Sequence, residues 1–278
     1  MLTVPVRSLG AGDRAEAYAV LDRDPLGGAQ VAERLTQRGW HRWRAEGRLL
    51  GYGGPRPEAL CWVGSHLIPV CADAAAVGAF GELLSVQPRT CASVVGRADA
   101  VLGLWEHLAP AWGPAREVRA DQPLLLLDGP PAVAPDPEVR LVRRDEAAVL
   151  FPAAVAMYEE EIGMSPLADD GGAGYRSRLL ELIRARRAYA RVVDGEVVFK
   201  AELAVVTART AQIQGVWVAP PWRGKGLAAP AMAAVVADAL HRVAPTVSLY
   251  VNGYNTVARR AYERCGFRTV GTFATVLF

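Results

Sequence analysis

Residues 216–228 read VWVAPPWRGKGLA and join a strand pattern to a long helical pattern. Within this stretch, Arg223 and Lys225 are basic, while Gly224 and Gly226 let the main chain approach a ligand closely. The unpaired N–H groups at a helix start and the positive end of the helix dipole both favour an anion. The stretch therefore predicts a loop that binds pyrophosphate.

The flanking sequence predicts an α/β domain over residues 139–278. Strand patterns are rich in β-branched residues, and the helices show one apolar face. A last pair of strands is expected to end at Phe278. The other expected strands cover 138–144, 188–194, 196–206, 210–218 and 247–251, and the first two expected helices cover 145–162 and 172–187. A third helix is expected after Pro221 and runs to about Val243. A fourth carries Ala258, Ala261, Tyr262 and Cys265 on one face and is expected to end at a cap, Gly266.

The segment DGPPAVAPDPE, residues 128–138, is expected to be a linker because its four prolines disfavour helix interiors and central strands. A chain of 278 residues suits two domains. Residues 1–127 are expected to form an N-terminal α/β domain of unknown function. Their helices near 12–38, 73–86 and 97–110 and their strands near 49–54, 59–65 and 91–95 repeat the rhythm of the second half, so a degenerate copy of the same fold is one interpretation.

Two motifs in the second half resemble those of the GNAT N-acetyltransferases. Residues 223–228 match the (Arg/Gln)-x-x-Gly-x-(Gly/Ala) pattern of that family. Downstream, Asn255, Ala258, Tyr262 and Gly266-Phe267 resemble its Asn-x-x-Ala-x-x-x-Tyr-x-x-x-Gly-Phe pattern. The whole chain also resembles bacterial two-part proteins that carry a domain of unknown function ahead of a GNAT domain.

The resemblance implies an acyl-CoA N-acyltransferase fold, with a mixed and mostly antiparallel sheet flanked by helices. It implies that strands 210–218 and 247–251 begin paired and then splay, which leaves a slot for the pantetheine arm of acetyl-CoA. Backbone groups of Val216 and Val218 would bind the donor and polarise its thioester. The other implied donor-binding residues are Arg223, Gly224, Lys225, Gly226, Leu227, Ala228 and Asn255.

Direct attack of an amine on the thioester requires a base, an oxyanion donor and an acid. Tyr262 matches the acid position of the family, although a core aromatic would show the same spacing. The base is harder to assign, since residues 203–222 contain no acidic side chain. Glu202 is the first candidate for the base because it lies on a strand that is expected to neighbour the donor-binding strand. It faces the same side of that strand as Lys200, so a structural Lys200–Glu202 ion pair fits equally well.

The acidic run Glu159 to Glu161 lies where the resemblance places the acceptor site, and the carboxylate of Phe278 is a third possibility for the base. The acidic run is more simply explained as a solvated helix face. Pro230 is harmless only if the helix begins near Leu227. In the first half, the place of the loop is taken by residues 70–73, which end in a good helix N-cap, Asp73, whose carboxylate would repel a phosphate.

Composition limits the partners of the protein. The 31 basic and 29 acidic residues give a net charge of +2, so we expect neither a nucleic acid nor a membrane partner. Cys61, Cys71, Cys91 and Cys265 lack CxxC spacing and the four histidines are scattered, so no metal is expected. Without a recognisable signal peptide or a bilayer-length apolar stretch, the protein is expected in the cytoplasm.

These observations favour an enzyme that transfers an acetyl group from acetyl-CoA to a primary amine of a small molecule, peptide or protein. The expected assembly is a monomer built as a pseudo-dimer, or a homodimer. An alternative is a regulatory or scaffold protein that binds CoA with little or no transfer, as the missing acid at 203–222 suggests. A purely structural protein that binds neither CoA nor an amine is disfavoured, because the phosphate-binding loop motif is intact.

Overall fold

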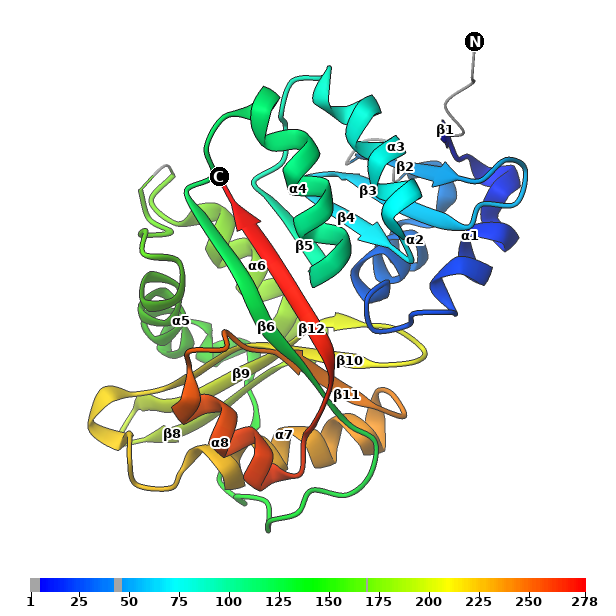
Figure 1. The fold of residues 1–278 in the computed structure, drawn as a ribbon. Helices are drawn as coiled ribbons and strands as arrows, with labels where there is room; N and C mark the ends of the chain where they lie inside the picture. The colour runs from blue at the N-terminus through cyan, green and yellow to red at the C-terminus, as the bar shows by residue number, and fades with distance from the viewer. Residues whose placement is uncertain (1–5, 43–46, 169) are drawn as a thin grey trace. The chain divides into compact units, whose positions relative to one another are not determined.

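The computed structural model describes residues 6–42, 47–168 and 170–278, with the backbone alone for 38–42, and these residues form two compact units (Figure 1). Unit 1 contains the described residues among 1–124 together with 250–254 and 270–278. Unit 2 contains 125–249 and 255–269. No helix in the described part of the chain is long and apolar enough to cross a bilayer.

The first half of the chain supplies a strand order of β1-β2-β3-β4-β5 to unit 1, and this sheet continues into β12 and then β6. Its elements are β1 (Val6–Ser8), α1 (Arg14–Leu21), α2 (Ala29–Arg42), β2 (Gly47–Tyr52), β3 (Ala59–Gly64), β4 (His66–Val70), α3 (Ala74–Ser85), β5 (Ser93–Arg97), α4 (Ala98–Trp112) and β6 (Glu117–Leu127).

The second half places its strands in unit 2 in the order β11-β10-β9-β8-β7. Its elements are β7 (Arg140–Leu141), the 3-10 turn η3 (Arg144–Glu146), α5 (Ala147–Ile162), α6 (Ala173–Arg184), β8 (Ala188–Val193), β9 (Glu196–Val206), β10 (Ala211–Val218), the 3-10 turn η4 (Pro220–Trp222), α7 (Ala228–Arg242), β11 (Val247–Tyr250), α8 (Thr256–Cys265) and β12 (Arg268–Leu277).

The two halves of the chain repeat one order of elements, β-α-α-β-β-β-α-β-α-β. Each half also contains one parallel strand pair that holds together over two residue pairs only. In the first half β4 meets β5 at His66↔Ser93 and Leu67↔Val94, and in the second half β10 meets β11 at Ala211↔Val247 and Gln212↔Ser248. These shared features support the interpretation of residues 1–127 as a degenerate copy of the second half.

Unit 1 buries both faces of its strands, and neighbouring residues alternate between the faces as the period of a strand requires. Leu49, Leu60 and Ile68 join the cluster of α1 and α2, whereas the adjacent residues Leu50, Cys61 and Leu67 join the cluster of α3 and α4. Figure 1 shows α3 and α4 side by side over these strands.

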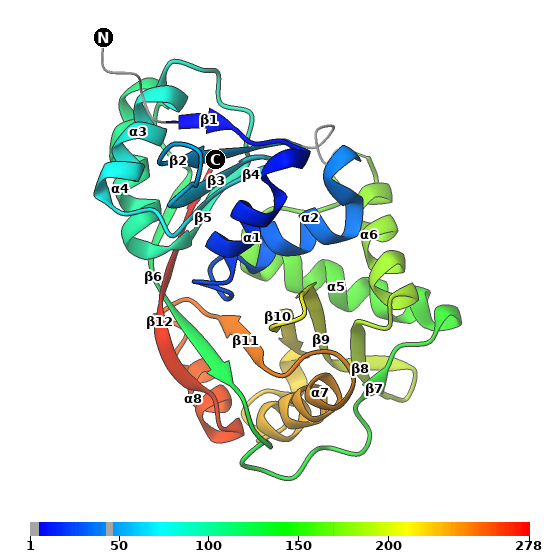
Figure 2. The ribbon, with the colours of Figure 1, turned by 90° about the vertical axis from the view of Figure 1, so that its right-hand side faces the viewer.

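Unit 2 is layered in the same way, with α5 and α6 on one face of β8 to β10 and α7 on the other (Figure 2). Leu150, Leu179 and Ile183 pack with Ala188 and Ala190 on the first face. On the second face, the Tyr189 hydroxyl donates to Asp238 Oδ2 at 2.6 Å, which ties β8 to α7. The first face of this sheet thus contacts its helices through apolar side chains, whereas the second also uses a hydrogen bond between side chains.

The structure differs in several details from the fold expected from the sequence. The strand at 138–144 is confined to β7, Arg140–Leu141, and the expected last strand pair is the single strand β12. Residues 250–254 and 270–278 belong to unit 1, so the compact units do not follow one cut at 128–138. The strands β4 and β6 were not expected. In β4, Pro69 pairs with Cys61 of β3 but lies beyond the last pair with β5, where a missing N–H is tolerated.

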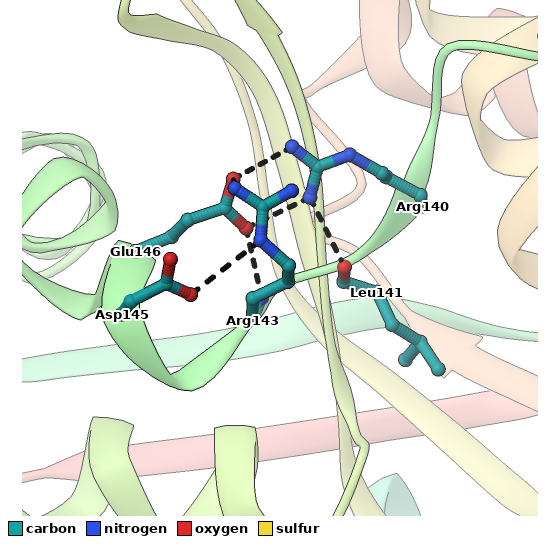
Figure 3. Close-up of polar contacts among 5 residues, drawn as sticks. All are labelled: Arg140, Leu141, Arg143, Asp145 and Glu146. Carbon is teal, nitrogen blue, oxygen red and sulfur yellow. Dashed lines mark hydrogen bonds and ion pairs between the residues drawn. The ribbon is translucent and has the colours of Figure 1, made fainter.

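Glu146 organises the start of unit 2 (Figure 3). Its carboxylate accepts hydrogen bonds from both Nη atoms of Arg140, at 2.8 and 2.7 Å, and from the backbone N–H of Arg143 at 2.8 Å. The hydrogen bonds from Arg140 outweigh desolvation and, with the N–H of Arg143, lower the pKa of Glu146 to about 2. Arg143 Nη2 adds an ion pair at 2.9 Å, while Arg143 Nε lies 3.4 Å from Asp145.

Replacing Glu146 should make stability depend on pH in a defined direction. The folded-state pKa lies below the ordinary 4.5, so the carboxylate stabilises the fold fully above about pH 4.5 and loses this effect as the pH falls toward 2. Glu146→Gln should lower the free energy of unfolding by about 1 kcal/mol at pH 7, a value discounted for the exposure of both arginines. In urea unfolding, this difference should shrink below pH 4.5. Asp145→Asn is the control and should change stability by less than about 0.5 kcal/mol, so equal losses for both variants would contradict the assignment.

Candidate functional site

A bulge in β10 bends the strand at the centre of unit 2. Gln214 pairs with Glu202 and Trp217 pairs with Lys200, so two residues of β10 stand against one residue of β9. The first of the two is Gly215, with φ +58°. A Cβ there would lie 2.9 Å from Lys200 Nζ, so both the backbone angle and the close packing require glycine.

Lys200 and Glu202 lie beneath this bulge on the α5 and α6 face. Lys200 is 1 % exposed, and its Nζ donates to the carbonyl of Gly215 at 2.8 Å and to Glu202 Oε2 at 3.3 Å. The ion pair that the sequence allowed is therefore present. The Glu202 carboxylate also lies close enough to Tyr175 to raise its pKa, although burial of Tyr175 is the larger cause.

The splay predicted for strands 210–218 and 247–251 is confirmed. β10 and β11 share only Ala211↔Val247 and Gln212↔Ser248, so β10 continues from Ile213 onward without a register partner in β11. Val216 lies in the bulge and Val218 pairs with Phe199 of β9. The edge of β10 that faces away from β9 can thus receive an extended ligand.

The loop after β10 leads to an uncapped helix. Gly224 and Gly226 have φ +73° and +79°, and a Cβ at either position would meet no atom within 4 Å. No side chain caps α7, whose N-cap residue is Leu227. Alternating left-handed glycines before a helix start turn backbone N–H groups toward one point, which is the arrangement that holds phosphate. Pro230 is the third residue of α7, so it lies in the first turn, where proline is harmless.

The Arg223 side chain braces the loop instead of reaching into it. Its Nε donates to the carbonyl of Val218 at 2.8 Å, and its Nη2 contacts both carboxylate oxygens of Glu160, at 3.0 and 2.7 Å. Trp217 Nε1 donates to the same carboxylate at 3.1 Å. Glu160 therefore joins the end of α5 to the end of β10 and to the loop. Sequence reasoning named Glu160 only within an acidic run and did not find this contact.

The second motif forms α8. Asn255 is its N-cap, with Oδ1 accepting from the backbone N–H of Ala258 at 3.1 Å. Tyr262 is 7 % exposed and packs edge-on against Phe267, with ring centroids 6.1 Å apart. Burial raises the pKa of Tyr262, and the carboxylate of Glu161 adds to this effect. The phenol thus keeps its proton across the neutral range and lies near the acidic end of α5.

The first half has no equivalent of the loop in its described residues. The short connection from β4 to α3 ends at Asp73, whose carboxylate accepts from the backbone N–H of Ala76 at 2.9 Å. The N-cap predicted at Asp73 is confirmed, and it places a negative charge where a phosphate would bind. Phe278, the third source of a base, belongs to unit 1, where it packs against Trp105 and Trp112.

No group of three or more His, Cys, Asp or Glu side chains that could hold a metal ion occurs among the residues described. All four cysteines are free, and three of them are buried. Hydrogen-bond donors, a helix start and titratable side chains are therefore the chemical groups that this site offers.

The family comparison agrees with this geometry. Residues 155–267 match the model of the acetyltransferase (GNAT) family. These residues form a GNAT domain. The match spans the end of α5, the bulged β10, the glycine loop and α8, so it includes every element of the site. Residues 47–150 match a domain of unknown function, DUF4081, and no curated protein sequence is detectably similar to the chain.

Solved structures share the fold across nearly the whole chain, including the part before the GNAT domain. A GNAT-family acetyltransferase from Colwellia psychrerythraea has 13% identity and a TM-score of 0.60, covering 98% of this chain and 99% of its own. A Drosophila protein has 14% identity and a TM-score of 0.65 over 99% and 98%. A GCN5-related N-acetyltransferase from Sphaerobacter thermophilus has 18% identity and a TM-score of 0.59 over 98% and 95%. The predicted fold class is confirmed.

Removing the ammonium of Lys200 should destabilise the GNAT domain strongly. Lys200→Met leaves the carboxylate of Glu202 and the carbonyl of Gly215 without their buried partner, so the free energy of unfolding should fall by about 3–5 kcal/mol. The double variant Lys200→Met with Glu202→Gln removes the unpaired charge and should recover part of this loss in urea unfolding. A double variant as unstable as the single one would show that the pair is not the source of the stability.

Proposed function

We propose that the protein is an N-acetyltransferase that moves an acetyl group from acetyl-CoA to a primary amine. The observation that carries the proposal is the uncapped start of α7 behind Gly224 and Gly226, directly after a strand that has left its parallel neighbour. The loop offers a site for pyrophosphate, and the free edge of β10 offers a site for the pantetheine arm.

Each predicted donor-binding residue has a role in this proposal. Backbone groups from Arg223 to Ala228 surround the pyrophosphate, and those of Val216 and Val218 bind the pantetheine amides and the thioester oxygen. Lys225 adds a positive charge to the loop. The Arg223 side chain acts through the loop because Glu160 already holds it. Asn255 acts through the start of α8, which it caps.

The chemistry is a direct acyl transfer. The lone pair of the amine attacks the thioester carbon, the C–N bond forms, and the electron pair of the C–S bond leaves with sulfur. The backbone N–H of Val216 stabilises the oxyanion. Tyr262 gives its proton to the leaving thiolate and regains one from the nitrogen as the amide forms, whereas Glu202 takes the earlier proton that the ammonium group loses to become the attacking amine. Glu160 and Glu161 at the end of α5 attract the cationic amine before it loses that proton.

A CoA-binding regulatory protein with little transfer is the second candidate. It is favoured by one observation, since the Glu202 carboxylate on β9 beneath the bulge is already paired with Lys200. A panel of amine acceptors separates the two functions. Release of CoA thiol with at least one amine supports the enzyme, whereas donor binding without release by any amine supports the regulatory protein.

The proposed acceptor is a small-molecule, peptide or protein amine, and the proposed location is the cytoplasm. The repeated order of elements fits a monomer built as a pseudo-dimer, and a homodimer is the other assembly we consider. Neither a nucleic acid nor a membrane partner is part of the proposal.

Blocking the loop should abolish donor binding. Gly226→Trp places a bulky side chain at the start of α7, where glycine has φ +79°. Calorimetry should detect one equivalent of acetyl-CoA per wild-type chain, because Asp73 occupies the matching helix start in the first half. The variant should show no binding. Two equivalents would contradict the role of Asp73, and a variant that binds normally would move the donor site away from the loop.

Removing the Tyr262 hydroxyl should slow transfer without weakening donor binding. Tyr262→Phe keeps the ring packed on Phe267, so kcat should fall about 10²- to 10⁴-fold while the Kd for acetyl-CoA stays within about twofold. Because burial raises the pKa of Tyr262, its ionisation should not reduce the wild-type rate below about pH 10. Steady-state thiol release between pH 6 and 10 measures both effects. An unchanged kcat would assign Tyr262 to packing alone.

A further inference from the structure

Residues 128–138, the predicted linker, lie against unit 2 and form a strap on it. Figure 2 shows the strap in green below α7, before the chain enters β7. The backbone N–H of Ala132 donates to the carbonyl of Cys265 at 2.8 Å, which attaches the strap to the end of α8. Four residues of the strap are proline, and two of them flank Asp136, so few backbone angles are open to Asp136.

Asp136 binds two elements of unit 2. Its backbone N–H donates to the carbonyl of Pro230 at 3.0 Å, which joins the strap to the first turn of α7. Its carboxylate accepts from Nη1 of Arg191 on β8 at 2.7 Å and from the backbone N–H of Glu138 at 2.9 Å. Asp136 is 8 % exposed, and a buried carboxylate is costly to separate from its cation. Asp136 therefore fixes the strap to α7 and β8 together.

Arg191 continues this connection to the glycine loop. Its guanidinium carbon lies 5.7 Å from the centroid of the Trp222 ring, and Nζ of Lys225 lies 5.5 Å from the same centroid. Both are cation–π contacts. Asp136 and these three side chains line one cavity of about 430 Å³ beside α7, so the strap stands apart from the loop and Arg191 connects the two.

The shape of the glycine loop depends on how its two ends are held. Gly224 and Gly226 have positive φ angles, and a Cβ at either position would meet no atom within 4 Å, so side-chain packing does not hold the middle of the loop. The loop begins directly after Trp222 and runs into the helix turn that contains Pro230. Asp136 is bonded to the second end and reaches the first end through one guanidinium.

We propose that Asp136 is a positioning residue of the donor site. It holds Pro230 through its N–H and Trp222 through Arg191, and thereby sets the spacing between the two ends of the glycine loop. The N–H groups of the loop then converge on the pyrophosphate before the donor arrives, which lowers the ordering cost of binding. The inference rests on the proposed function. It makes a residue that precedes both GNAT motifs a determinant of the affinity for acetyl-CoA and not of the rate of acyl transfer.

Calorimetry and steady-state kinetics on the full chain test this role. Asp136→Asn keeps the size of the side chain and an oxygen for the N–H of Glu138, but removes the charge that pairs with Arg191. The Kd and the KM for acetyl-CoA should rise about tenfold, while kcat at saturating donor, measured with an amine from the panel, stays within about twofold. Arg191→Met should have the same effect. The double variant should bind no more weakly than Arg191→Met alone, because both changes break one connection.

Two control variants separate positioning from stability. Arg191→Lys keeps a cation for Asp136 and Trp222, so its Kd should stay within about threefold of the wild type. Asp128→Asn removes an exposed ion pair with Arg268, 2.5 Å long, from the other end of the strap and should change the Kd by less than about twofold. Urea unfolding of each variant gives the fraction folded under the assay conditions. An Asp128→Asn protein that binds as weakly as Asp136→Asn would overturn the proposal.

Hydrogen exchange without any donor measures the loop end itself. The N–H of Ala231 donates to the carbonyl of Leu227 at 3.1 Å and closes the first turn of α7. In Asp136→Asn this N–H should exchange faster than in the wild type, because a strap that has lost Arg191 holds the turn less firmly. Amides of β9 should keep their rates. Equal exchange at Ala231 in the two proteins would show that the Asp136 carboxylate does not hold the loop.

Two negative binding results have different meanings. If the wild type binds acetyl-CoA and Asp136→Asn binds it equally well, the positioning role is overturned and the donor site stands. If the wild type binds no acetyl-CoA, the proposed function is overturned, and the positioning of a donor is overturned with it, whatever the exchange rates are.

Discussion

The bulge at Gly215 is the constraint on which the rest of the GNAT site depends. Two residues of β10 opposite one residue of β9 bend β10, and the strand is paired with β11 over only its first two residues. The bend separates the sheet edge left free beside β11 from the face that holds Lys200 and Glu202. It also sets the direction in which β10 enters the loop at residues 223–228. The positive φ of Gly215 and the ammonium beneath its carbonyl keep the bend in place.

Sequence patterns predicted the parts of this site that are local in the chain. The glycine loop and the start of α7 each depend on a few consecutive residues, so their motif contains the required information. The contact between Arg223 and Glu160 joins residues 63 positions apart and depends on how α5 packs on the sheet. Likewise, the sequence predicted strand structure before Phe278 but not that it is one strand, β12, whose neighbours in the sheet are β5 and β6.

The two faces of the sheet in unit 2 carry separate clusters of charged side chains. The face covered by α5 and α6 carries the ion pair of Lys200 and Glu202, together with Tyr175 near the same carboxylate. The opposite face carries Arg191 and the cavity beside α7. Each face thus carries a cation paired with a carboxylate, Lys200 with Glu202 on the first and Arg191 with Asp136 on the second.

The position of β12 in unit 1 determines the order in which the parts of the protein can fold during synthesis. β12 lies between β5 and β6 in the sheet, although about 170 residues separate it from β5 along the chain. When β6 leaves the ribosome, the neighbour that separates it from β5 has not been synthesised. Unit 1 therefore spends about half of translation with two unpaired strand edges inside its sheet, which makes the nascent chain prone to association with other chains. Completion of unit 1 must follow the synthesis of the whole GNAT domain, so the N-terminal part of this protein is the last to finish folding.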